Sequence, residues 1–164
     1  GYNYVSFNGT KSPDGTFVED FHNETLYYSN LKVVFIEALA NELLTNGTGP
    51  QDNETKLAVM EKVDADLNLT NTLDPECKQR WFPLGIKLGY PNTTEPAHMF
   101  ISSMGRMKYL NPIYRALLET DQRVLAVSWF CENKGFYHPL AIAALKKLLS
   151  LTDEEFACVP APPP

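Results

Sequence analysis

The sequence of 164 residues lacks the features of several large protein classes. Its 14 Lys and Arg residues are outnumbered by 20 Asp and Glu residues, which gives a formal net charge of -6. Binding to nucleic-acid phosphates needs a dense basic surface, so this balance argues against a nucleic-acid partner. Lys32, Glu37 and Glu42 interrupt the longest apolar stretch, residues 31–44, which is too short and too polar for a transmembrane helix.

Short motifs that mark catalytic or metal sites are also missing. There is no His-Glu-x-x-His zinc motif, no Gly-rich phosphate loop, no Gly-x-Ser-x-Gly elbow and no Cys-His relay. The three histidines, His22, His98 and His138, are too dispersed for a local set of metal ligands. Glu95 and His98 have the spacing of carboxylate-bridged metal sites, but a single copy is more typical of a polar helix start. We expect no catalytic residue, metal or cofactor on this chain.

Asparagine-x-threonine sequons, by contrast, are abundant. With 12 Asn and 19 Ser plus Thr residues, composition alone predicts about one or two sequons. Six occur, at Asn8, Asn23, Asn46, Asn53, Asn68 and Asn92. This excess indicates N-linked glycans and a secreted, extracellular glycoprotein. The absence of a signal peptide at Gly1 fits a mature secreted chain, and the alternative is a cytosolic protein with an Asn- and Thr-rich surface.

The odd number of cysteines leaves the disulfide pattern open. The chain contains Cys77, Cys131 and Cys158, so one internal disulfide is the most it can form. We favour Cys131 with Cys158, because the acidic turn and Pro-rich tail could fold back on a neighbouring helix. Cys77 would then be buried, free or intermolecular. Three unpaired core cysteines are the alternative.

Length and a hydrophobic content of 44% are sufficient for one domain with a core. We expect an irregular arm at residues 1–24, a helical domain at 25–150, and an acidic turn with a Pro-rich tail at 151–164. Helical periodicity predicts a first helix from Thr25 to Leu44 and a second from Glu54 to Asp66. The apolar face of the first helix would consist of Leu31, Val34, Phe35, Ala38, Leu39 and Leu43.

Proline and glycine then mark a series of short helices. Four X-Pro pairs predict helix starts, namely Asp74-Pro75, Glu95-Pro96, Asn111-Pro112 and His138-Pro139. Left-handed C-terminal caps are predicted at Gly89, Gly105 and Gly135. No segment has a comparably strong strand pattern. The sequence therefore predicts an all-α fold of short antiparallel helices, which can stack into a right-handed α-α superhelix of the armadillo or HEAT type.

Two cations stand out in the predicted connection between Gly105 and Asn111. Arg106 and Lys108 would project to the same side of an extended segment, whereas on a helix they would diverge. Arg offers a planar fork suited to a carboxylate, and Lys adds a compact charge. Both can thus converge on one anion, although two neighbouring cations are more often only a solvated surface. A set of eight aromatic residues is more typical of a core than of a ligand site, namely Trp81, Phe82, Tyr109, Tyr114, Trp129, Phe130, Phe136 and Tyr137.

The run Met-Gly-Arg-Met-Lys-Tyr-Leu-Asn-Pro-Ile-Tyr-Arg-Ala-Leu-Leu, residues 104–118, resembles the closing segment of the leukotriene A(4) hydrolase and aminopeptidase family. The likeness continues through Asp-Gln-Arg-Val at residues 121–124 and Tyr-His-Pro-Leu-Ala at residues 137–141. Before residue 105 it is more diffuse and includes Arg80-Trp81.

This resemblance implies the family's C-terminal α-helical domain, a small superhelix of antiparallel helices. It also implies that Arg106 and Lys108 hold the carboxylate of a substrate. The family's zinc motif and exopeptidase motif belong to a catalytic domain that this sequence does not contain. Pro83 is a second departure, because it should break or kink a helix that is continuous in the family.

Two hypotheses follow. In the first, the chain is a secreted, non-catalytic binding module for an acidic hydrophobic molecule or a peptide C-terminus, or an assembly module that binds another protein or a second copy of itself. In the second, it is the C-terminal chain of a secreted zinc aminopeptidase or epoxide hydrolase, with zinc and catalytic domain on another chain.

Overall fold

The computed structural model describes residues 26–45 and 49–158, with side chains described from residue 30 onward. The predicted arm at residues 1–24 and most of the Pro-rich tail lie outside the described residues. Within the described ranges every regular element is helical and there is no strand. The elements are α2 (Leu26–Leu44), α3 (Asn53–Leu67), α4 (Pro75–Leu88), the 3-10 helix η1 (Pro91–Thr93), α5 (Thr94–Ser103), α6 (Met107–Glu119), α7 (Arg123–Asn133), α8 (Pro139–Leu148) and α9 (Asp153–Ala157). The all-α prediction is confirmed.

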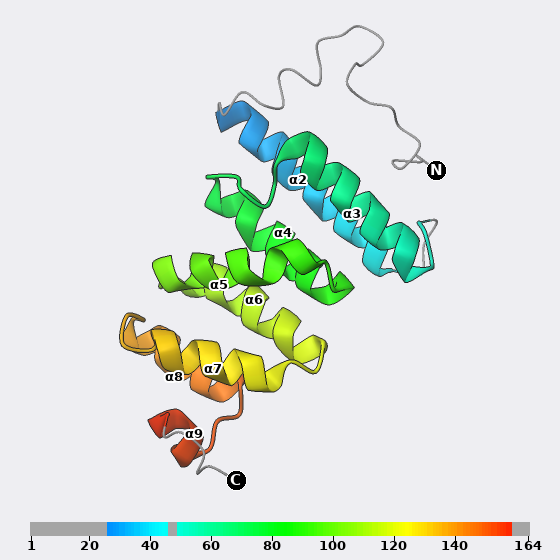
Figure 1. Cartoon of the computed structure of the whole chain (residues 1–164). Helices are drawn as coiled ribbons and strands as arrows, with labels where there is room; N and C mark the ends of the chain where they lie inside the picture. Colours follow the sequence, from blue (N-terminus) through cyan, green and yellow to red (C-terminus); the bar gives the residue numbers. More distant parts are fainter. Residues whose placement is uncertain (1–25, 46–48, 159–164) are drawn as a thin grey trace, which may run out of the picture.

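The helices follow one another along the molecule as a stack. Figure 1 places α2 and α3 at one end, α4, α5 and α6 in the middle, then α7 and α8, with α9 at the other end. Helix α4 lies at the centre and packs most extensively against α6 and α2. The handedness of the predicted superhelix stays a prediction. No helix in the described ranges is both long enough and apolar enough to span a bilayer.

Two of the predicted proline starts are confirmed and two are not. Asp74 caps α4 by accepting a hydrogen bond from the Glu76 N–H, and Pro75 occupies the first helical position. His138 caps α8 in the same way before Pro139. Helix α5 instead begins at Thr94, two residues before Pro96.

The prediction of a helix start at Pro112 is wrong, because Pro112 lies inside α6. Starting this helix at Met107 places Tyr109, Leu110, Ile113 and Tyr114 on one buried face at helical spacing. Burial of these large side chains outweighs the hydrogen bond that the proline nitrogen cannot donate.

The prediction that Pro83 would break a helix is also wrong, because α4 continues through it. Nine of its 14 residues are buried, among them Trp81 and Phe82, so tertiary packing again exceeds the local cost of proline. The Trp81 indole N–H donates to the Thr70 hydroxyl at 2.9 Å, and that hydroxyl donates to Asp64 of α3 at 2.6 Å. This buried chain of polar contacts fixes α4 against the end of α3.

Gly89 forms the predicted left-handed cap of α4, with φ of 71°. The same prediction is wrong for Gly105 and Gly135, neither of which has a positive φ. Helix α5 ends at an extended Met104, and α7 ends at Lys134 in a right-handed conformation. Among the described residues, the other left-handed positions are Asn68, Asp121, Ser150 and Cys158.

The predicted apolar face of the first helix is partly wrong. Leu43 is buried as predicted, but Val34 is 61% exposed and Ala38 is also exposed. Ile36 and Lys32 are buried in their place. The face of α2 is set by its packing against α4, which its own periodicity does not specify.

Candidate functional site

The two predicted cations lie at the beginning of α6. Arg106 is the N-cap residue, with extended backbone angles of -86° and 129°, whereas Lys108 already belongs to the first turn. The connection is therefore extended only up to Arg106, and the predicted extended segment to Asn111 is wrong. The structure nevertheless places both cations against the same aromatic side chain, since Arg106 Cζ and Lys108 Nζ lie 5.9 Å and 5.6 Å from the centre of the Tyr109 ring. The Tyr109 ring, which is buried, gives them a common base.

Lys108 is held by a carboxylate of the same chain. Its Nζ atom donates to Glu76 Oε1 at 2.6 Å, and the Tyr109 hydroxyl donates to the same oxygen at 3.0 Å. Glu76 comes from the first turn of α4, where the Asp74 cap fixes the backbone. The hydrogen bond from Lys108, followed by that from Tyr109, holds the pKa of Glu76 below its ordinary value despite partial burial.

Arg80 extends this contact to α2. Its guanidinium donates to Glu37 of α2 and to Glu76 Oε2, the latter at 3.4 Å. Gln79 also donates to Glu76 Oε2, at 3.2 Å. Glu76 therefore joins α4 and α6 and is linked through Arg80 to α2. Sequence reasoning missed Glu76, although its spacing of four residues from Arg80 on a predicted helix was a detectable signal.

Arg106 differs from Lys108 because no carboxylate of the described residues pairs with it. It is exposed, and among the residues that the structure describes no carboxylate or hydrogen-bond acceptor pairs with its guanidinium. An apolar side chain lies close to the preceding residue, Gly105. A Cβ atom on the adjacent Gly105 would be 3.5 Å from the Phe136 ring, and this ring is 58% exposed. An exposed guanidinium on a residue whose neighbour lies close to exposed aromatic surface suits a ligand with a carboxylate and an apolar portion.

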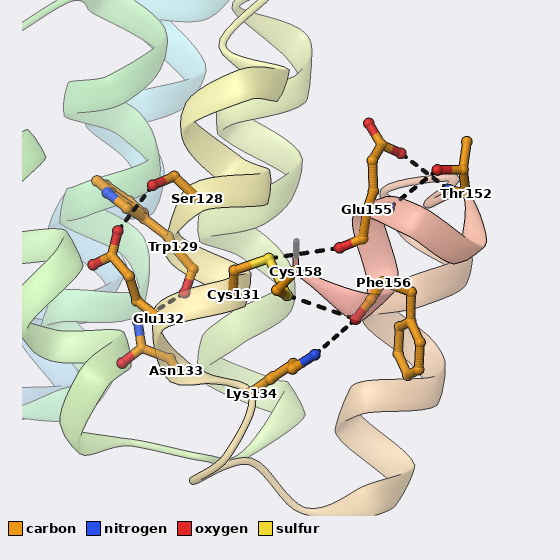
Figure 2. Close-up of a disulfide and its surroundings, with 10 residues drawn as sticks. All are labelled: Ser128, Trp129, Cys131, Glu132, Asn133, Lys134, Thr152, Glu155, Phe156 and Cys158. Atoms are coloured by element: carbon orange, nitrogen blue, oxygen red, sulfur yellow. Dashed lines mark hydrogen bonds between the residues drawn. A yellow bond between two sulfur atoms is a disulfide. The ribbon is translucent and has the colours of Figure 1, made fainter. Parts of the chain in front are cut away.

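A second set of charged contacts surrounds α9 at the other end of the stack. Figure 2 shows the disulfide between Cys131 of α7 and Cys158, which follows α9. Their Cα atoms are 5.4 Å apart. This is the pairing that we favoured from the sequence. Cys77 is free and buried, and burial, together with nearby Asp74, raises the pKa of its thiol to about 12, so it is not a reactive nucleophile.

Arg123 donates four hydrogen bonds from its guanidinium to internal partners at this end. It donates to both carboxylate oxygens of Glu155, at 2.7 Å and 2.8 Å, and to the backbone oxygens of Leu149 and Ser150. The hydrogen bonds that Glu155 accepts from Arg123, and from the backbone N–H of Thr152, lower its pKa to about 2. The Lys134 ammonium also donates to the backbone oxygen of Phe156 at 2.7 Å (Figure 2). Helix α9 is thus attached by ion pairing, hydrogen bonding and a covalent bond.

The Glu95 and His98 pair does not form a metal site. His98 Nε2 lies 3.1 Å from Glu132 Oε2 of α7, and its ring stacks on Trp129 with centres 4.7 Å apart. His98 therefore links α5 to α7. Within the described residues no group of three or more His, Cys, Asp or Glu side chains could hold a metal ion, so this part of the chain does not fit a zinc site.

Three predicted glycosylation sites can be placed in the structure. Asn53 begins α3, Asn68 caps its C-terminal end, and Asn92 lies in η1, and all three are exposed. Asn8, Asn23 and Asn46 lie outside the described residues. Occupancy of all six sites by glycans stays a prediction.

Comparison with known proteins gives a family match over most of the chain. The family model described as "Leukotriene A4 hydrolase, C-terminal" matches residues 27–149, three quarters of the sequence. Similar proteins include "Leucine aminopeptidase 2" of Ajellomyces capsulatus, 39% identical over 79 residues, which are 48% of this chain and 12% of that protein. The "Leukotriene A-4 hydrolase homolog" of Botryotinia fuckeliana is 35% identical over 80 residues, or 49% of this chain and 12% of that protein. The chain thus spans about an eighth of the length of these relatives. No solved structure matches it.

Proposed function

This chain belongs to the family of leukotriene A4 hydrolase C-terminal domains, and on that basis we propose that it binds the carboxylate of an apolar ligand at Arg106 and Lys108. The name α6 corner is used below for Arg106, Lys108, Tyr109 and Glu76. The observation that carries this proposal is the exposed guanidinium of Arg106, which pairs with no carboxylate of the described residues and follows Gly105, the residue that lies close to exposed Phe136.

The ligand chemistry follows from these neighbours. A guanidinium binds a carboxylate through two parallel hydrogen bonds, and an adjacent apolar surface favours a ligand whose carboxylate terminates a hydrophobic chain. A peptide C-terminus and an acidic lipid both have this form. The described residues supply no catalytic group beside the α6 corner, so the proposed role is binding and not chemical conversion.

We further propose that the protein is secreted and glycosylated. The disulfide between Cys131 and Cys158 supports an oxidising compartment. The exposure of Asn53, Asn68 and Asn92 supports their use as glycan acceptors. Glycans at these sites would also keep the surface near α3 and η1 away from a large protein partner, which leaves the α6 corner available.

A second candidate function is that of a helical domain in a larger aminopeptidase. The observation that favours it is the short span of the chain relative to its relatives, which are named leucine aminopeptidase 2 and leukotriene A-4 hydrolase homolog. In this case Arg106 and Lys108 would hold the C-terminal carboxylate of a substrate, and a separate catalytic domain would provide the zinc.

Binding of the peptide N-acetyl-Ala-Ala-Leu, compared with its C-terminal amide, tests the first proposal. Protein NMR can follow dissociation constants as weak as millimolar. We expect the acid to bind at least about tenfold more tightly than the amide, and the double variant Arg106→Ala, Lys108→Ala to lose this preference. Equal binding by the wild type and the double variant would sink the carboxylate proposal.

Mass spectrometry of material from its natural source, under non-denaturing conditions, separates the two candidates. A zinc-containing polypeptide that co-purifies in fixed ratio, or is joined to this chain, would favour the aminopeptidase. A lone glycosylated chain of this length would favour the binding module.

A further inference from the structure

Glu76 is already in the position that a ligand carboxylate would take at Lys108. Its Oε1 atom accepts hydrogen bonds from Lys108 Nζ at 2.6 Å and from the Tyr109 hydroxyl at 3.0 Å. A tyrosine hydroxyl has only one proton to donate, and Glu76 uses it. An ammonium has three protons, so Lys108 can still bind a second anion only if that anion lies close to Glu76.

Lys108 already has a carboxylate partner, whereas Arg106 has none within the described residues. The Lys108 side chain is 51% exposed but paired, and Arg106 has no carboxylate partner among the residues that the structure describes. Both cations lie within 6 Å of the centre of the same Tyr109 ring. A carboxylate that contacts both cations must therefore come close to the Glu76 carboxylate, which is bonded to Lys108. The two negative charges repel each other, and the repulsion is stronger than in bulk water because Glu76 is partly buried.

From this geometry we propose that Glu76 is an internal competitor for the ligand carboxylate and determines the specificity of the α6 corner, an inference that rests on the proposed function. Glu76 takes up one of the two positive charges, which makes the corner selective for ligands with a single carboxylate. A dicarboxylate ligand meets repulsion from Glu76. Replacement of Glu76 by an uncharged isostere releases Lys108 for the ligand.

The structure supports a role for Glu76 beyond passive surface pairing. Its side chain is contacted from two helices, by Gln79 and Arg80 on α4 and by Lys108 and Tyr109 on α6. The hydrogen bonds from Lys108, Tyr109 and Arg80 keep its pKa below the ordinary value, so Glu76 is ionised at neutral pH and competes as a full negative charge.

The test compares Glu76→Gln with wild type for two probes, N-acetyl-Ala-Ala-Leu and the dicarboxylate N-acetyl-Ala-Ala-Glu. Gln keeps an oxygen that can accept from Lys108 and Tyr109, so the fold should be retained, which circular dichroism checks. We expect Glu76→Gln to bind the monocarboxylate about tenfold more tightly and the dicarboxylate about a hundredfold more tightly. Adding Lys108→Ala to Glu76→Gln should cancel the gain.

The matched control is Glu154→Gln, which removes the same charge from an exposed position on α9. It should leave both dissociation constants within about twofold of wild type. Unchanged or weaker binding of both probes by Glu76→Gln, while Arg106→Ala still reduces binding of the acid, would overturn the role of Glu76 and leave the proposed function intact. If no variant affects binding and acid and amide bind equally, the proposed function fails and the inference fails with it.

Discussion

The α6 corner and the attachment of α9 use similar residues for different ends. Arg123 donates to Glu155 and to two backbone oxygens, so each of its three guanidinium nitrogens has a partner within the protein. Arg106 has an extended backbone, an exposed side chain and no described acceptor. The difference shows that the role of an arginine depends on whether the fold satisfies its donors, which sequence alone does not reveal.

Loss of the disulfide that attaches α9 should reduce the free energy of unfolding more than truncation of Arg106 or Arg123. The double variant Cys131→Ser, Cys158→Ser removes a cross-link between residues that are 27 apart in sequence. We expect the free energy of unfolding to fall by about 3–4 kcal/mol, from the added entropy of the unfolded chain. Urea unfolding measures this change, and wild type under strong reductant should behave like the variant. Equal stability of variant and oxidised wild type would show that α9 is not cross-linked.

Truncation of Arg123 and of Arg106 should change the free energy of unfolding less than loss of the disulfide, and by different amounts. Arg123→Ala should lower the free energy of unfolding by about 1 kcal/mol, since its side chain is 41% exposed and its ion pair is partly screened. Arg106→Ala should change it by less than about 0.5 kcal/mol. Urea unfolding of both variants at the same salt concentration makes the comparison. A larger loss for Arg106→Ala would reverse the assignment of structural and binding arginines.

The free energy of unfolding at acidic pH should depend on the ionisation of Glu155. Because its pKa is lowered from 4.5 to about 2, its ionised form stabilises the attachment of α9 fully above pH 4.5. This contribution is lost as the pH falls from 4.5 through about 2. Carboxyl NMR titration should show the depressed pKa in wild type and a higher pKa in Arg123→Ala, which still stays below 4.5 because the Thr152 N–H continues to lower it. An unshifted Glu155 in wild type would mean that the pair with Arg123 does not form in solution.

At the α6 corner the smallest effect is a change in the pKa of Glu76. Lys108→Ala should raise this pKa, because the hydrogen bond from Lys108 is the main cause of its depression. Arg106→Ala should have little effect, since Arg106 has no hydrogen bond to Glu76. Carboxyl NMR titration of both variants provides the measurement. If the pKa of Glu76 rose more in Arg106→Ala than in Lys108→Ala, Glu76 would be paired with Arg106 and not with Lys108.

Local sequence signals predict the parts of this fold that depend on neighbouring residues. The cap and proline at Asp74-Pro75 and the left-handed Gly89 need only the backbone chemistry of those positions. The predicted break at Pro83 and the predicted helix start at Pro112 are wrong, because burial of the α4 and α6 faces outweighs the local cost of proline. The face of α2 was misread for a similar reason, since α4 determines which side is covered.

The candidate site could be predicted only in part. Arg106 and Lys108 are recognisable from their motif, but their different states are not. The Lys108 partner, Glu76, lies 32 residues away in sequence, as does the Arg123 partner, Glu155. Pairing at such separations depends on how α4 meets α6 and how α9 returns to α7, which is a property of the assembled fold.

NMR signals of the side-chain Nε–H groups of Arg106 and Arg123 test most directly whether Arg106 binds an external carboxylate while Arg123 does not. In a titration with N-acetyl-Ala-Ala-Leu, the Arg106 signal should shift with saturation while the Arg123 signal stays fixed. An unmoved Arg106 signal would show that Arg106 does not bind the carboxylate, and equal shifts at both arginines would show that binding is not specific to Arg106.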